Sequence, residues 1–68
     1  MSHIYLAGEG HGAIALVKGI LNETNLIPSI IVITHDRELI EICKKHTIKI
    51  KTNIPFRNLK REDIVITS

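Results

Sequence analysis

The sequence lacks most of the features that stabilise a chain of this size. It has 68 residues, one cysteine (Cys43) and no tryptophan. A single thiol excludes an internal disulfide, and no cysteines and histidines have the spacing of a zinc site, so we expect no metal. A domain this short buries only about 60% of the surface that its unfolded chain exposes. The remaining means of stabilisation is a partner chain, and we therefore predict a homo-oligomer.

Long apolar runs are also missing. The longest aliphatic run covers residues 30–33, far short of the roughly 20 residues that span a bilayer. Residues 1–4 have neither the basic start nor the apolar stretch of a signal peptide. We therefore expect no membrane partner and a cytoplasmic location, with the single thiol in keeping with a reducing compartment.

Acidic residues are absent from the segment 44–61, which carries seven lysines and arginines. Residues 1–43 have the opposite balance, with two basic and five acidic side chains. A basic segment can attract a polyanion, but it is also typical of a solvated strand and loop. We favour the solvated interpretation over nucleic-acid binding, because the sequence indicates no aromatic stacking platform beside the charges.

Apolar patterning predicts strands that alternate with helices. Four segments have the patterns of short β-strands: residues 3–7, 30–33, 47–51 and 64–66. Two segments have helical spacing: residues 13–21 and 36–46. The unbroken β-branched run 30–33 suits a strand covered on both faces, whereas the alternation over 47–51 suits a half-exposed edge strand. Residues 52–63 form a loop with three apolar anchors, Ile54, Phe56 and Leu59.

Right-handed crossovers between these segments predict an α/β fold. It is half of a Rossmann-like unit, a single truncated domain over residues 1–68 with a four-stranded parallel sheet of order 3-2-1-4. The first two crossovers run in the same direction, so both helices lie on one face. The loop 52–63 is too short to supply a helix for the other face. We expect an uncovered apolar face and an open edge at the fourth strand, the usual features of a partner surface.

A glycine-rich turn follows the first strand. Gly8, Gly10 and Ala13 match the pattern G-x-G-x-x-G/A, in which small residues permit a tight turn, a close phosphate and close packing of helix on strand. Backbone N–H groups at the helix start then face an anion. The turn predicts a nucleotide or a phosphorylated small molecule. Three small residues can also simply form a compact turn, and the Glu9 carboxylate repels a phosphate unless it points away.

The predicted ligand-binding residues come from this turn and from the end of the second strand. They are Gly8, Glu9, Gly10, His11, Gly12, His35 and Asp36. The two histidines could bond a base or phosphate from the rim of one crevice, or they could simply be exposed. Asp36 could bind a ribose hydroxyl or cap the second helix. No spacing predicts a catalytic residue or a cofactor, and Cys43 is expected to be a buried small hydrophobe.

The chain resembles the N-terminal part of the formyltransferase family, which includes methionyl-tRNA formyltransferase and the sugar N-formyltransferases. The resemblance spans residues 3–67. It is carried by His-Ile-Tyr-Leu-Ala-Gly-Glu-Gly-His-Gly at 3–12, Ile-Ile-Val-Ile at 30–33, Leu-Ile-Glu-Ile-Cys-Lys-Lys-His at 39–46 before Ile-Lys-Ile at 48–50, and Asp-Ile-Val-Ile at 63–66. In that family the catalytic Asn, His and Asp and most of the folate site follow the fourth strand. The resemblance therefore implies a half-domain that has lost formyl transfer, in which only Gly8, Gly10 and Gly12 correspond to the family's turn.

Three functions fit these features. The first is a small homo-oligomeric protein that binds a nucleotide or phosphorylated small molecule, for example a sequestering protein of the phage sponge type. The second is a catalytically inactive, formyltransferase-like interaction module that uses its apolar face or the segment 44–61. The third is an enzyme with a composite site between subunits, whose acid–base candidates are Glu9, His11, His35 and Asp36. No spacing supports a particular reaction, so we favour the two functions without catalysis.

Overall fold

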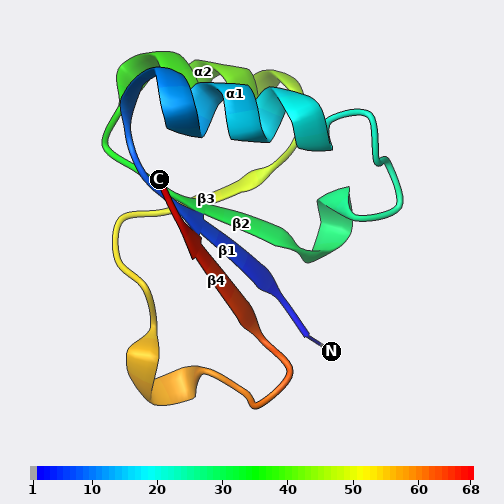
Figure 1. Ribbon diagram of the computed structural model, residues 1–68, viewed down its shortest axis with the longest axis vertical. Coiled ribbons are helices and arrows are strands. Elements are labelled where there is room, and N and C mark those ends of the chain that lie inside the picture. Colours follow the sequence, from blue (N-terminus) through cyan, green and yellow to red (C-terminus); the bar gives the residue numbers. More distant parts are fainter. Residues whose placement is uncertain (1) are drawn as a thin grey trace.

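Four strands form one parallel sheet in the computed structural model of the chain, which describes residues 2–68 (Figure 1). They are β1 (Ile4–Ala7), β2 (Ile30–Ile33), β3 (Lys49–Lys51) and β4 (Ile64–Thr67). Their order in the sheet is β3-β2-β1-β4, and each neighbouring pair is parallel. The predicted α/β half-Rossmann topology with strand order 3-2-1-4 is confirmed.

Helices α1 (Gly10–Ile20) and α2 (Arg37–Lys45) cover the same face of this sheet, as predicted (Figure 1). Helix α1 begins at Gly10, three residues before the predicted start at Ala13. The prediction was wrong here because it followed the helical spacing of the apolar residues, which begins only after the glycines. Two glycines of the turn consequently lie inside the first turn of the helix.

The strand register decides which side chains share a face of the sheet. Tyr5 in β1 lies beside Ile31 in β2 and Val65 in β4. Neighbours in a parallel sheet point to the same side, and successive residues point to opposite sides. Leu6 and Ile66 therefore point toward the helices. We call these two sides the loop face, which carries Tyr5, and the helix face, which carries Leu6.

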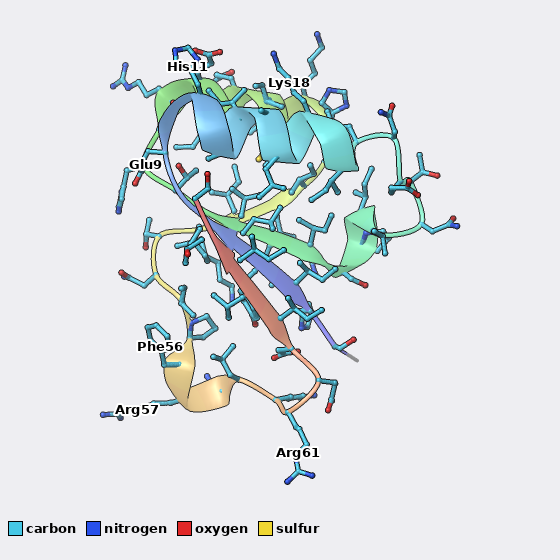
Figure 2. All side chains as sticks on the ribbon, viewed as in Figure 1. Glu9, His11, Lys18, Phe56, Arg57 and Arg61 are labelled. Atoms are coloured by element: carbon cyan, nitrogen blue, oxygen red, sulfur yellow. The ribbon has the colours of Figure 1, made fainter. Side chains whose placement is uncertain are left out.

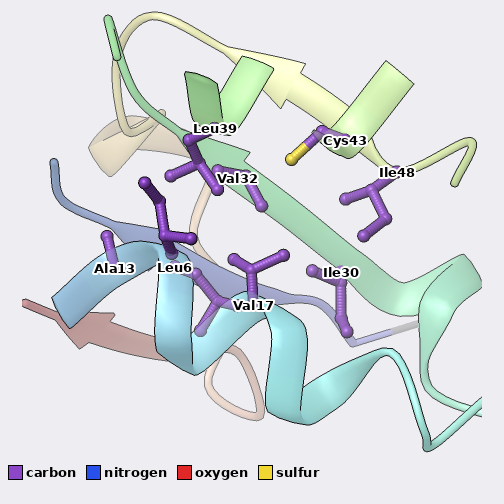
Figure 3. Close-up of a cluster of buried hydrophobic side chains, with 9 residues drawn as sticks. Leu6, Ala13, Val17, Ile30, Val32, Leu39, Cys43 and Ile48 are labelled. Carbon is purple, nitrogen blue, oxygen red and sulfur yellow. The ribbon is translucent and has the colours of Figure 1, made fainter. Parts of the chain in front are cut away.

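The main core lies between the helix face and the two helices (Figure 3). Its largest fully buried side chains come from both helices and the central strand β2: Val17, Ile30, Val32, Leu39 and Cys43. Cys43 is a free, buried thiol, as predicted, and burial raises its pKa. Every residue of β2 is buried, in agreement with the prediction that its β-branched run is covered on both sides.

The loop face carries a second, smaller core over β1 and β2. Tyr5 and Ile31 are each 4% exposed, and Ile54 and Leu59 of the segment 52–63 pack against them. The expectation that this face is uncovered was therefore wrong over β1 and β2, because two apolar loop side chains replace the missing helix. The prediction that Phe56 is a third apolar anchor of this loop was also wrong, because its side chain is 72% exposed.

The expected apolar exposure is found instead on β4. All four of its residues are exposed, and Ile64, Val65 and Ile66 keep 52%, 39% and 37% of their surface in solvent. Over residues 2–68 these are three of the five large hydrophobic side chains that are exposed. Strand β4 is also an edge of the sheet, as predicted.

Candidate functional site

The predicted site residues lie in two turns that meet at the carboxyl ends of β1 and β2. The Gly8 N–H donates to the Ile33 carbonyl oxygen at 3.2 Å, so the two turns begin side by side. Residues 8–12 belong to the turn after β1, and residues 34–36 belong to the turn after β2. The structure thus brings the seven predicted residues to one edge of the sheet, where ligands bind in many open α/β folds.

The Asp36 carboxylate joins the two turns. One oxygen accepts hydrogen bonds from the N–H groups of Glu38 at 3.0 Å and Leu39 at 3.4 Å, the arrangement of a helix N-cap. The other oxygen accepts from the Gly10 N–H at 2.7 Å. The Gly10 bond is the main reason that the Asp36 pKa is lowered. Of the two roles predicted for Asp36, the structure shows the helix cap.

The Glu9 carboxylate makes the reciprocal connection. Its Oε2 atom accepts from the Thr34 hydroxyl at 2.9 Å and from the His35 N–H at 3.0 Å. The His35 N–H and then the Thr34 hydroxyl are the main causes of the lowered Glu9 pKa. Glu9 thus points toward the β2 turn and makes no side-chain cap bond to its own helix. Each turn therefore supplies the anion that the N–H groups of the other turn bind.

Thr34 is the residue of this site that the sequence analysis missed. It is only 2% exposed, and its hydroxyl lies 2.8 Å from the Gly8 carbonyl oxygen and 2.9 Å from Glu9 Oε2, either of which can accept its proton. The same hydroxyl oxygen accepts from the Asp36 N–H at 3.0 Å. The available signal was a threonine two residues before a helix-capping aspartate, where hydroxyl-to-backbone bonds are common.

The glycines of the turn admit close neighbours within the chain. A Cβ on Gly8 would lie 2.5 Å from the Ser68 backbone oxygen and 3.2 Å from the Ala13 Cβ atom. Gly10 has φ +75°, which favours glycine. A Cβ on Gly12 would lie 2.8 Å from the Ser68 Oγ atom. The predicted close packing at Ala13 is present, and the close approach at Gly8 and Gly12 is made by Ser68.

The two histidines flank the joined turns with exposed side chains. His11 lies on the outer side of α1 near its start (Figure 2), where its charge contributes to the lowered Asp36 pKa. His35 contributes its backbone N–H to Glu9 rather than a bond from its ring. Both rings remain open to solvent at the same edge of the sheet. Nothing in this geometry tests whether they bind a nucleotide, which stays a prediction.

Other possible sites lie elsewhere or do not form within residues 2–68. An open surface hollow lies along α2, lined by Glu41, Ile42, Lys44 and Lys45. In the part of the chain that the structure describes, no group of three His, Cys, Asp or Glu side chains could hold a metal ion. No helix over the same residues has the length and apolar character needed to cross a membrane.

Comparison of the chain with protein-family models, curated proteins and solved structures found no match. The resemblance to the formyltransferase family therefore stays a prediction from residues 3–67.

Proposed function

We propose that the chain is a small interaction module that assembles into a homodimer through β4. The observation that carries this proposal is the run of three exposed aliphatic residues, Ile64 to Ile66, on an open edge of the sheet. Unpaired edges and exposed apolar patches usually mark surfaces that bind a partner. A second copy of the chain is the occupant that the surface area and the strand geometry favour.

The total surface of the chain supports a second copy. The chain exposes 4793 Å², whereas a monomer of its 7.6 kDa mass exposes about 4300 Å². The excess is roughly 500 Å² per chain. Burying that excess on two copies removes about 1000 Å² from water, which reaches the lower limit for a specific protein interface.

The backbone of β4 has unpaired groups on its outer side. The Ile64 N–H donates to the His3 carbonyl oxygen at 3.0 Å, and the Ser68 N–H donates to the Ala7 carbonyl oxygen at 2.9 Å. Backbone groups alternate in direction along a strand. The N–H and C=O groups of Val65 and Thr67 therefore point away from β1, toward the open edge. They offer two donors and two acceptors to another strand.

An antiparallel pair of β4 strands satisfies these groups. With the two-fold axis at Ile66, Val65 of each copy faces Thr67 of the other, and the two pairs exchange four hydrogen bonds. The same surface serves both copies, as a closed dimer requires. A parallel pair in register would instead place Asp63 beside Asp63 of the other copy, and like charges directly opposite are destabilising. The antiparallel pair avoids this repulsion.

The dimer geometry favours an interaction module over a composite enzyme. In an antiparallel β4 pair, the carboxyl ends of the two parallel sheets point in opposite directions. The joined turns around Glu9 and Asp36 of one copy then lie far from those of the other. Such a dimer builds no shared site from His11 and His35, so its function lies in its continuous sheet and outer surfaces.

Sedimentation velocity of the 68-residue chain tests the proposal, with a dimer of twice 7.6 kDa as the expected result. Thr67→Pro removes the outward N–H of the edge strand and should yield a monomer, because a proline cannot donate the bond. Thr67→Val keeps that N–H and is the matched control, which should remain a dimer. Circular dichroism of both variants verifies that each is folded.

Val65→Lys is an independent variant that leaves the backbone donors in place. It puts a charge at the centre of the edge, the device by which natural edge strands avoid pairing, and should also give a monomer. A wild-type chain that stays monomeric up to millimolar concentration would sink the proposal. So would a dimer that both Val65→Lys and Thr67→Pro leave intact.

A further inference from the structure

The most exposed large hydrophobic side chain lies away from β4. Phe56 is 72% exposed over the described residues, and it projects from the loop between β3 and β4 (Figure 2). Its neighbours behave differently, because Ile54 and Leu59 pack against the loop face of the sheet. The loop therefore presents one aromatic ring to solvent between two side chains that are packed on the sheet.

The backbone around Phe56 is held in place by local bonds. The Phe56 N–H donates to the Ile54 carbonyl oxygen at 2.9 Å, and the Asn58 N–H donates to the Pro55 carbonyl oxygen at 2.9 Å. At the end of the loop, Asp63 accepts from the Lys60 N–H at 2.9 Å and from the His3 N–H at 2.8 Å. The loop therefore presents the ring on a fixed turn.

Exposed cations follow the ring in the same loop. Arg57, Lys60 and Arg61 belong to the same loop and are exposed, and the segment 44–61 contains no acidic residue. Two further lysines, Lys49 and Lys51, are paired in register with Ile31 and Ile33 and so point to the loop face of the sheet. We call Phe56, Arg57, Lys60 and Arg61 the basic loop surface.

We propose that the basic loop surface binds a single-stranded nucleic acid, with Phe56 stacking on a base and the cations contacting phosphates. The sequence analysis favoured a solvated segment because it expected Phe56 to be a buried anchor, and the exposed ring supplies the aromatic face that was missing. Single strands bind where an aromatic face lies beside positive charge, because every base has a π face and every linkage carries a negative charge. An acidic peptide would use the cations but not the aromatic face. A duplex keeps its bases stacked, and one exposed ring cannot reach them without unstacking.

Fluorescence anisotropy with a fluorescein-labelled 12-mer of deoxythymidine, and separately of uridine, tests this proposal on the full 68-residue chain. Both single strands should bind, and the corresponding duplex should bind more weakly. Removing the ring by Phe56→Ala should weaken binding about tenfold. Raising the salt from 50 to 200 mM should weaken it about twenty-fold, if three cations neutralise phosphates on a single strand.

Matched controls separate base stacking from nonspecific hydrophobic or electrostatic binding. Leu26→Ala removes another exposed hydrophobic side chain, 41% exposed and outside the loop, and should leave oligonucleotide affinity unchanged. Lys18→Ala removes an exposed cation on α1 and should change it far less than Arg57→Ala. The variant Phe56→Trp introduces the only tryptophan of the chain, and its emission should be quenched when a base stacks on it.

The outcomes are distinguishable from those of the dimer proposal, because Phe56 lies outside β4. Failure of both 12-mers to bind overturns the inference. Equal affinities of the wild type and Phe56→Ala also overturn it, as does preferential binding of the duplex. If Phe56→Ala instead dissociates the dimer in sedimentation, the ring is a protein contact, and the inference is wrong while β4 pairing is tested separately by Thr67→Pro.

Discussion

The two edge strands of this sheet present opposite surfaces to solvent. Strand β3 is three residues long, with exposed Lys49 and Lys51 on either side of a half-buried Ile50. Strand β4 is one residue longer and carries Ile64, Val65 and Ile66 without a charge. Charged residues and short length are the usual means of keeping an edge strand unpaired. By this measure β3 is protected from pairing and β4 is not.

The helix face repeats this asymmetry. On the β3 side, α2 covers the sheet with the fully buried Leu39 and Cys43, and Ile50 packs against the same core. On the β4 side, Ile64 and Ile66 remain exposed. The comparison teaches that, among the four strands, only β4 leaves large apolar side chains exposed, and this is the edge at which we propose that a second copy adds.

Truncating one aliphatic side chain on each side of the sheet should show the largest difference in stability. Leu39→Ala should lower the free energy of unfolding by about 3 kcal/mol, because it opens a cavity in a packed core. That is a large share of the roughly 3–10 kcal/mol available to a domain of this size. Ile64→Ala should cost less than about 1 kcal/mol, because its side chain is already half exposed. Urea denaturation of dilute protein measures both, and similar losses would show that β4 is covered in the monomer.

Removal of the charges on β3 should allow this edge strand to pair with a strand of another copy. The double variant Lys49→Val, Lys51→Val leaves both edges apolar. If copies can then add at either side, the proposed dimer should grow into open-ended assemblies. Light scattering measures the growth. The control Lys44→Ala, Lys45→Ala removes the same charge from α2 and should stay dimeric. If the β3 variant also stays dimeric, edge charge is not what keeps β3 unpaired.

Much of this comparison could be predicted from the sequence. The alternation over 47–51 indicated an exposed edge, and the topology placed the other edge at the fourth strand. What the sequence could not show was that Ile54 and Leu59 lie under β1 and β2 while Phe56, in the same loop, is exposed. Three apolar residues in a loop have no periodicity from which to read their direction, which depends on the path of the loop across the sheet.

The candidate site was predicted in its membership but not in its bonding. The order of the strands and turns along the sequence placed Glu9 and Asp36 at the carboxyl ends of two neighbouring strands. Each carboxylate accepts a hydrogen bond from a backbone N–H of the other turn, and Glu9 also accepts one from Thr34. These bonds depend on the distance between β1 and β2 at their carboxyl ends. A sequence pattern written for a phosphate cannot distinguish an external anion from a carboxylate of the same chain.

Acid should loosen β4 before it loosens β3. The N–H groups of Lys60 and then of His3 lower the Asp63 pKa below its ordinary value. A lowered folded-state pKa contributes stability above about pH 4, and this contribution is lost as the pH falls through the folded-state value. Between pH 5 and pH 3, hydrogen-exchange protection of the Ile64 amide, which donates to His3, should fall more than that of the β3 amides.

Asp63→Asn is the control for this acid effect. The amide keeps an oxygen that can accept a hydrogen bond, but it does not titrate in this range. In this variant the difference between β4 and β3 should no longer depend on pH, although Glu9 and Asp36 continue to lower the stability of the whole fold in acid. An undiminished pH-dependent difference would assign it to another group.

The smallest effect expected is a gain in stability on the protected side, at the residue that leads from α2 into β3. Thr47 has φ +56°, the only positive φ of a non-glycine residue over the described chain. The Ile48 N–H donates back to the Cys43 carbonyl oxygen at 2.9 Å, as it does where helices end in a left-handed residue. A β-branched side chain is strained in that conformation, so Thr47→Gly should stabilise the fold by about 1 kcal/mol. Urea denaturation should show this gain, and sedimentation should show no change in the proposed dimer, because Thr47 lies outside β4. A loss of stability would mean that the hydrogen bond from the Thr47 hydroxyl to the His46 carbonyl oxygen, at 2.6 Å, outweighs the strain.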